Sequence, residues 1–284
     1  FRHLLEPLHA DLALYLGNAS IPDALAKRAR FIWSRPEPSD WSQSLDDIAR
    51  REGLSTTKWR KIVKRRRAWR EGGLFGGASS SAGQPILGGS GAIIFTLRYW
   101  LLEDAAGALD QYERVVLTRT DHLHLCPHDN FFPRPGTIGI APGEDYGGYT
   151  DRHHVFHPRD KRRALNILSW VLANPNRANN PEKAIKKSWR EQGIVVHELS
   201  RSVATVATLA DKTRWQDPFN VVFRGVQPQM LCLSGRFGDK RGTDRADVAV
   251  TSRSLGLALK YSPEFEDATR QCAERGFVSN IVVC

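Results

Sequence analysis

Hydrophobic and polar positions vary along this chain in patterns that predict both helices and strands. Near the N-terminus, leucines recur at helical spacing, and we expect residues 1–57 to be helical and polar. These leucines are Leu4, Leu5, Leu8, Leu12 and Leu16. A proline-rich break at residues 35–38 precedes a helix from about Trp41 to Glu52, for which Ser39 or Asp40 is a suitable N-cap.

The middle of the chain predicts a helix followed by a buried strand. From Ala92 to about Leu109, apolar side chains surround the whole circumference, as in a helix packed against a sheet. Within Arg114–Thr120, the run Val115-Val-Leu117 is typical of a central strand buried on both faces. Further strands are expected at Leu123–Pro127, Thr137–Ala141, Ile194–Leu199, Val203–Leu209, Val221–Arg224 and Met230–Leu233. Further helices are expected at Lys161–Ala173, Pro181–Gln192, Leu255–Tyr261 and Glu264–Arg275.

These elements predict an α/β fold with a central, mostly parallel sheet, flanking helices and extra N-terminal helices. We divide the chain into an N-terminal helical region (1–71), a glycine-rich loop (72–91) and an α/β region (92–284) that forms one domain with part of residues 1–71. With 284 residues, of which 41% are hydrophobic, the chain is long enough to bury a core.

Charge changes the list of expected partners. The net charge of +10 favours polyanionic or phosphorylated ligands. The densest basic run, Lys58–Arg70, predicts either a polyanion-binding patch or a helix with its apolar side chains inward. Those side chains are Trp59, Ile62, Val63 and Trp69. No nucleic-acid-binding motif accompanies the run, so we do not expect nucleic acid as a partner.

Cysteines and apolar runs leave the compartment open. None of the four cysteines forms a Cys-x-x-Cys pair, which argues against a structural zinc site. No signal peptide or membrane-length apolar run is visible. The sequence begins at Phe1 rather than Met, so we expect a domain cut from a longer protein. Any membrane attachment would then depend on a missing N-terminal anchor.

Titratable residues gather between Tyr112 and His157. The predicted central strand ends in Arg119 and Asp121, and charged ends of buried strands are where α/β proteins build active sites. Asp121 with Mg²⁺ or Mn²⁺ and Arg119 can hold a diphosphate. The alternative is an internal ion pair between Arg119 and Asp121 that closes the strand.

A loop with paired glycines follows, from Gly143 to Phe156. Its acids are Glu144, Asp145 and Asp151, and Asp160 lies shortly beyond. Asp151 stands beside Arg152 and after Gly147-Gly148, so its carboxylate is a candidate metal ligand, sugar binder or general base. The alternative is a surface turn that Asp151 caps.

Two further patterns invite functional interpretation. The helix start at Gly89, Ser90 and Gly91 exposes backbone N–H groups that suit a phosphate, although a capping turn explains it equally well. Six of the nine histidines lie in the Tyr112–His157 window, which allows a metal-dependent hydrolase. They are His122, His124, His128, His153, His154 and His157. No complete zinc motif accompanies them, so we favour the acids.

The strand and the loop together resemble a known family. Tyr112-Glu-Arg-Val-Val-Leu-Thr-Arg-Thr-Asp121 resembles the "Tyr-Asp-x-Val/Ile-x-x-x-Arg-x-Asp" strand of GT-A-like glycosyltransferases. Tyr146-Gly-Gly-Tyr-Thr-Asp-Arg-His153 resembles a later loop of the same proteins. The similarity extends from about Gly88 to Trp215 and looks closest to an uncharacterised eukaryotic family of fungi, algae and plants.

This resemblance implies transfer of a sugar from a nucleotide-sugar donor to an acceptor hydroxyl. Asp121 would take the metal-binding role with Mn²⁺ or Mg²⁺, and Arg119 and Arg152 would bind the diphosphate. Asp151, Glu144, Asp145 or His153 would be the catalytic group. The acceptor (glycan, protein or lipid) stays open. By analogy we expect the Golgi lumen, with the cytoplasm as alternative. The chain has Arg119-Thr-Asp121 where Asp-x-Asp is usual, so Arg119 can replace one cation charge.

Overall fold

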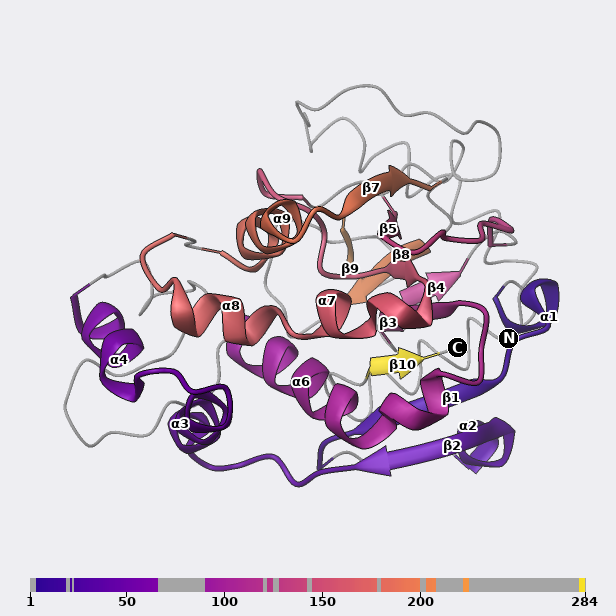
Figure 1. Ribbon diagram of the computed structural model, residues 1–284. Helices are drawn as coiled ribbons and strands as arrows, with labels where there is room; N and C mark the ends of the chain where they lie inside the picture. Colours follow the sequence, from indigo (N-terminus) through magenta and orange to yellow (C-terminus); the bar gives the residue numbers. More distant parts are fainter. Residues whose placement is uncertain are drawn as a thin grey trace.

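The computed structural model describes residues 4–18, 21, 23–65, 90–119, 122–124, 128–141, 145–177, 180–199, 203–207, 222–224 and 281–283. Over these residues the chain is mixed α/β, as its hydrophobic pattern predicts (Figure 1). Most of the helices gather on one side of a sheet that draws strands from both ends of the sequence.

The larger sheet has seven strands in the order β2-β1-β10-β3-β6-β5-β7. Their bounds are β1 Leu12–Leu16, β2 Ala29–Ser34, β3 Val115–Arg119, β5 Thr137–Ile140, β6 His154–Phe156, β7 Val195–Glu198 and β10 Ile281–Val283. Only the β1–β2 and β5–β7 pairings are parallel, so the sheet is mixed rather than mostly parallel. Nevertheless, β1, β2, β3, β5 and β7 run in one direction, and their carboxyl ends share one edge.

The first strand corrects our expectation for the N-terminal region. Residues Leu12–Leu16, predicted as helix, form β1, and all five are buried. A short helix α1 (Leu5–Leu8) precedes β1, and α2 (Asp23–Arg28) leads into β2. A continuous apolar run fits a strand covered on both faces as well as a helix, and leucine spacing alone cannot separate them. Strand β2 (Ala29–Ser34) likewise lies in the region predicted as helical, so part of residues 1–71 belongs to the sheet.

The remaining helices follow the predicted positions closely. They are α3 Trp41–Arg51, α4 Thr56–Arg65, α6 Ser90–Leu109, α7 Lys161–Leu165, α8 Ile167–Ala173 and α9 Pro181–Glu191. Asp40 is the N-cap of α3, and its side chain accepts a hydrogen bond from Ser42 N at 2.9 Å. The helix predicted over residues 161–173 is broken at Asn166. The Asn166 side chain accepts a hydrogen bond from Ser169 N and begins α8.

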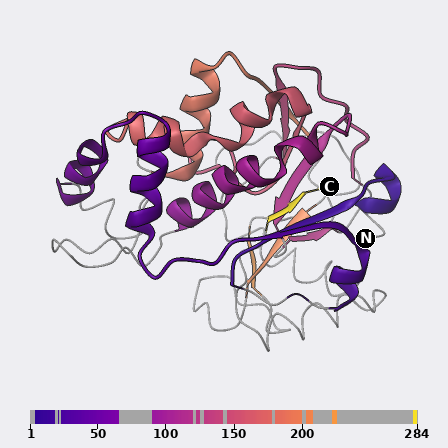
Figure 2. The same cartoon turned by 60° about the horizontal axis from the view of Figure 1, so that its bottom comes forward.

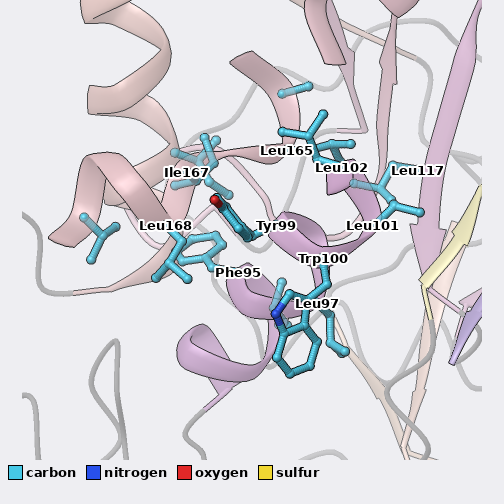
Figure 3. Close-up of a cluster of buried hydrophobic side chains, with 14 of the residues drawn as sticks. Phe95, Leu97, Tyr99, Trp100, Leu101, Leu102, Leu117, Leu165, Ile167 and Leu168 are labelled. Atoms are coloured by element: carbon cyan, nitrogen blue, oxygen red, sulfur yellow. The ribbon is translucent and has the colours of Figure 1, made fainter. Parts of the chain in front are cut away.

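Helix α6 forms the centre of the larger core. Figure 3 shows its apolar side chains between β3 and the helices α7 and α8. Phe95 and Leu101 are fully buried, and Leu117 of β3 and Leu168 of α8 belong to the same cluster. This placement confirms the predicted packing for residues 94–102, which are all buried, whereas Glu103 and Asp104 are exposed and pair with Arg35.

The opposite face of the sheet has its own apolar layer. Val116 and Val155, from β3 and β6, lie there with leucines of α1 and β1. Figure 2 shows the same arrangement from another side, with α6 on one face of the sheet. Side chains on both faces of β3 are buried. Its one charged residue, Arg119, is the last residue of the strand and is only partly buried.

A second, three-stranded sheet has the order β4-β8-β9. Its strands are β4 His122–His124, β8 Val203–Ala207 and β9 Val222–Arg224, which confirms three predicted strands. The elements predicted at Met230–Leu233, Leu255–Tyr261 and Glu264–Arg275 lie outside the described residues.

Candidate functional site

The register of two neighbouring strands brings two predicted site residues together. Strand β6 runs antiparallel to β3 with His154 opposite Leu117. If this register is continued two residues beyond that pair, it brings Arg119 level with Arg152 and next to Asp151. The Arg119 Nη1 atom is 3.8 Å from Asp151 Oδ2. Residues over thirty positions apart in sequence therefore meet at the carboxyl edge of the sheet, where α/β proteins place ligands.

A third charged residue, Arg98, reaches this edge from α6. Because only residues 110–114 separate α6 from β3, the helix runs back along the strand. From Arg98 to Leu109 the helix rises about 16 Å, and the five residues of β3 span about the same length. The two arginines are thus level, and Arg98 Nη2 donates a hydrogen bond to the backbone carbonyl of Asp151.

Arg98 is buried with only part of its hydrogen-bonding capacity used. Its exposed fraction is 2%. Within the part of the chain that the structure describes, its Nε and Nη1 atoms have no hydrogen-bond partner. Burial lowers the pKa of Arg98 to about 10, with Arg119 adding to the effect and Asp151 opposing it, so the side chain stays charged at neutral pH.

Asp151 is the anion to which these arginines are oriented. The residue is 5% exposed. Burial alone would raise its carboxyl pKa, but the charges of Arg119, Arg152 and Arg98 outweigh burial and lower it. An ionised carboxylate with a lowered pKa is a weak proton acceptor. The position of Asp151 beside arginines therefore favours a role in orienting their side chains over the role of a general base, which was one of the alternatives predicted for it.

The paired glycines, Gly147 and Gly148, allow their loop to pack closely against the start of α9. At Gly148, a Cβ atom would lie 2.0 Å from the Glu182 carbonyl carbon, so the loop can lie against the start of α9 only without a side chain. Tyr149 N donates a hydrogen bond to Glu182 O at 3.0 Å. Gly147 has φ +82° and Tyr146 has φ 42°, both in the left-handed region. This tight, anchored turn sets the course of the chain into Thr150 and Asp151.

Two of the histidines form a buried pair. His128 and His153 are 6% and 1% exposed, and their Nε2 atoms are 2.8 Å apart. His128 Nδ1 donates to Asp129 O at 2.7 Å, so His128 Nε2 accepts the hydrogen bond from His153. Burial lowers the pKa of His128, despite the opposing hydrogen bond to Asp129 O. The hydrogen bond between the two rings connects the segment that contains Asp151 to the loop before β5.

Other residues of the histidine and acid clusters have structural contacts. His154 is fully buried, packs edge-on against Trp189 and donates to Thr150 O at 2.7 Å. Burial, with the charge of Arg98, lowers its pKa to about 3, so its ring is neutral. His157 Nδ1 accepts from Arg159 N. Asp160 accepts from Gly136 N and forms an ion pair with Arg163.

The remaining predicted residues divide into two groups. Asp121, Glu144 and Gly89 lie outside the described residues. Ser90 begins α6, and the buried Gly91 lies about 10 Å along the helix axis from Arg98. The helix start and the arginines are therefore separate positions. Asp145 closes the glycine turn, its carbonyl accepting from Gly148 N at 2.6 Å.

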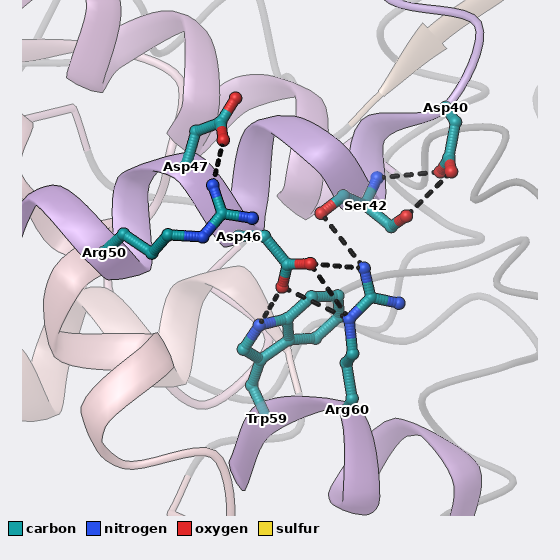
Figure 4. A network of polar contacts seen from close by, with 7 residues as sticks. All are labelled: Asp40, Ser42, Asp46, Asp47, Arg50, Trp59 and Arg60. Carbon is teal, nitrogen blue, oxygen red and sulfur yellow. Dashed lines mark hydrogen bonds and ion pairs between the residues drawn. The ribbon is translucent and has the colours of Figure 1, made fainter. Parts of the chain in front are cut away.

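The described part of the basic run packs against its neighbours. Trp59 is 1% exposed, and its Nε1 donates to Asp46 (Figure 4). Arg60 pairs with the same carboxylate at 2.6 Å and lies over the Trp59 ring. Lys58 Nζ donates to Ala173 O. The prediction that Trp59 faces inward is confirmed; Trp69 lies outside the described residues.

Within the described residues, no group of three or more His, Cys, Asp or Glu is arranged to hold a metal ion. The same part of the chain contains no helix with both the length and the apolar character that a membrane crossing needs. The search for similar proteins matched no family model, no curated protein and no solved structure. The resemblance to GT-A-like glycosyltransferases therefore stays a prediction.

Proposed function

We propose that this protein is a glycosyltransferase that moves a sugar from a nucleotide-sugar donor to an acceptor hydroxyl. The observation that supports this proposal most is the 3.8 Å approach of Arg119 to Asp151. These residues come from the two sequence motifs that carry the resemblance. Two motifs that are each weakly specific gain weight when they meet at the ligand-binding edge of an α/β sheet.

The leaving group of such a reaction is a nucleoside diphosphate, whose developing charge must be stabilised. Arg98, Arg119 and Arg152 supply that charge around Asp151. Guanidinium groups bind phosphate oxygens in a fixed, directional geometry. In our proposal Arg119 contacts the diphosphate, because its side chain is 19% exposed while Arg98 lies behind it.

The carboxylate and the arginines have separate tasks. Asp151 orients the guanidinium groups and stays ionised during the reaction, since its pKa is lowered. Two of the candidates for a base that activates the acceptor are described. Asp145 lies in the tight turn before Asp151, and His153 is hydrogen-bonded to His128. Glu144 is the third candidate. We propose the acid pair Glu144 and Asp145 as the acceptor side, because both residues precede Asp151 and Arg152 closely in sequence.

A GT-A-like arrangement is part of the proposal. Its support is the α/β class, the buried strand that ends in Arg119 and the apolar helix α6 before it. The resemblance also implies Mn²⁺ or Mg²⁺ at Asp121. Asp121 lies outside the described residues, and the described carboxylate beside Arg119, that of Asp151, faces arginines.

Release of nucleoside diphosphate from nucleotide sugars tests the proposal. Purified protein is incubated with UDP- and GDP-sugars in Mn²⁺, in Mg²⁺ and in EDTA, and UDP or GDP is measured by a coupled assay. Arg119→Met should reduce release at least about tenfold, as expected for loss of a charged contact to the leaving group. Arg50→Met is the matched control, because Arg50 is an exposed arginine of α3. If no donor binds and none releases UDP or GDP, the proposal is contradicted.

A further inference from the structure

Helices α3 and α4 are joined by a turn of four residues, from Glu52 to Ser55. Within this turn Gly53 has φ +67°, in the left-handed region that favours glycine. The Leu54 N–H donates a hydrogen bond to Ala49 O at 2.7 Å, which holds the turn against the end of α3. Two helices joined by a short turn that contains glycine form the helix-turn-helix arrangement found in many DNA-binding proteins.

The α3–α4 unit (residues 41–65) packs against the rest of the protein through one face. Ala49 of α3 and Trp59 of α4 are 0% and 1% exposed, and both belong to the main core. Asp46 of α3 accepts hydrogen bonds from Trp59 and Arg60 of α4 (Figure 4). These contacts fix the orientation of α4 relative to α3, as a helix that reads a nucleic acid requires.

The outward side of α4 is polar and basic. Thr57, Lys58 and Lys61 are exposed, and Arg60 keeps 41% of its side chain exposed while it pairs with Asp46. Thr57 and Lys61 are four positions apart, so they lie on the same face of the helix, within its first two turns. The sequence of α4 contains no Asp or Glu. The helix therefore presents cationic and hydroxyl donors without a negative charge of its own.

Duplex DNA is the polyanion whose shape fits such a helix. Its major groove is about 12 Å wide and admits an α-helix, whose N-terminal residues then reach the base edges. Lysine donates to guanine O6 and N7, and threonine contacts a base edge or the thymine methyl group. The net charge of +10 favours association with the phosphates that line the groove. The major groove of A-form RNA is too narrow for the same contacts.

We propose that the α3–α4 unit binds duplex DNA, with α4 in the major groove and Thr57 and Lys61 at the base edges. Arg60 keeps its contact with Asp46 and holds α4 in position. This site is separate from the sheet edge at the end of β3, because α4 lies at one end of the molecule (Figure 1).

The proposal differs from our sequence-based expectation of no nucleic-acid partner. That expectation considered the basic run alone, in which no motif is visible. The helix-turn-helix arrangement instead combines the start of that run with α3 and with the left-handed Gly53 between them. DNA binding by this unit is independent of the proposed sugar transfer.

Fluorescence anisotropy with a labelled random-sequence duplex of about 25 base pairs tests binding and its dependence on salt. The full chain should bind at low salt and lose affinity as the salt concentration rises. Lys61→Glu should weaken binding at least about tenfold, because it places a negative charge in the groove. Lys27→Glu is the matched control and should leave the affinity within about twofold, since Lys27 is an exposed lysine of α2, far from α4 (Figure 1).

Selection from a library of random duplexes tests base recognition separately. The wild type should enrich a short common sequence. Thr57→Ala should relax the preference at one position of that sequence while its affinity for random DNA stays within about threefold of the wild type. Thr57 and Lys61 are exposed, so both variants should fold, and thermal melts that match the wild type check this.

Each outcome decides for or against the proposal. Equal losses of affinity in Lys61→Glu and Lys27→Glu would show general attraction to a basic protein and overturn it. It is also overturned if the wild type enriches no sequence, if duplex RNA binds as tightly as duplex DNA, or if vesicles of anionic lipid bind and duplex DNA does not. Sequence-selective DNA binding that needs Lys61 supports the proposal, whether or not nucleotide sugars release their diphosphate.

Discussion

Substitution of Asp151 by asparagine should destabilise the fold strongly. The change keeps the shape of the side chain but removes the carboxylate between Arg98, Arg119 and Arg152. At the observed 3.8 Å, the Arg119–Asp151 attraction alone is about 4 kcal/mol for an effective dielectric constant of about 20. Removing one partner from a buried ion cluster typically costs about 3–5 kcal/mol, because the remaining buried charges lose an opposite charge.

The pH dependence of this loss follows from the lowered pKa of Asp151. A carboxyl group with a lowered folded-state pKa contributes stability above its ordinary value of 3.8 and loses that contribution as the pH falls through the folded-state pKa. The stability difference between the wild type and Asp151→Asn should therefore be constant above about pH 5 and shrink below about pH 4.

Urea unfolding followed by circular dichroism at several pH values measures both effects. Asp47→Asn is the control, because Asp47 pairs with Arg50 on the surface of α3 and should change stability by less than about 0.5 kcal/mol. A loss of under about 1 kcal/mol for Asp151→Asn, with an unchanged urea slope, would show that Asp151 does not balance the arginines. A difference that grows in acid would contradict the sign of the pKa change.

Three further predictions concern other contacts in the structure. Gly148→Ala should cost more than about 2 kcal/mol, because its Cβ would meet the Glu182 backbone, while Gly107→Ala, in open space within α6, should stabilise by about 0.5–1 kcal/mol; thermal melts of the two variants check this contrast. The His154 ring should show no titration between pH 5 and 8 by NMR, since its pKa lies near 3, and a midpoint near pH 6.5 would contradict its burial. Asp46→Ala should cost about 1–3 kcal/mol, because the Trp59 N–H and Arg60 lose a shared partner, and a change within about 0.5 kcal/mol in urea unfolding would contradict that role.

Local patterns in the sequence predicted most of the described elements. The apolar circumference of α6, the Val115–Leu117 run and the Asp40 cap each describe one segment and its immediate neighbours. The same approach failed at Leu12–Leu16, where helical leucine spacing was taken for a helix and the segment is a buried strand. Long-range pairing decided that case, since β1 lies between β2 and a strand from the chain's far end, β10.

The candidate site was predictable only in part. Arg119 and Asp151 stood out because each ends or follows a recognisable motif, but their approach depends on the β3–β6 register, which the sequence did not reveal. Strand β6 itself was not predicted, since His154–Phe156 is too short to show a period. Arg98 was not among the site residues predicted from the sequence. The signal that could have identified it is a single charge within residues 94–102, the buried part of α6.

The central claim is that the arginine-lined sheet edge holds the diphosphate of a nucleotide-sugar donor. Competition between UDP or GDP and a labelled nucleotide sugar, measured for the wild type, Arg119→Met and Arg50→Met, tests it most directly. We predict competitive displacement for the wild type and Arg50→Met, with donor affinity reduced about tenfold or more in Arg119→Met. Equal donor affinity in all three proteins, or no donor binding at all, would contradict the account.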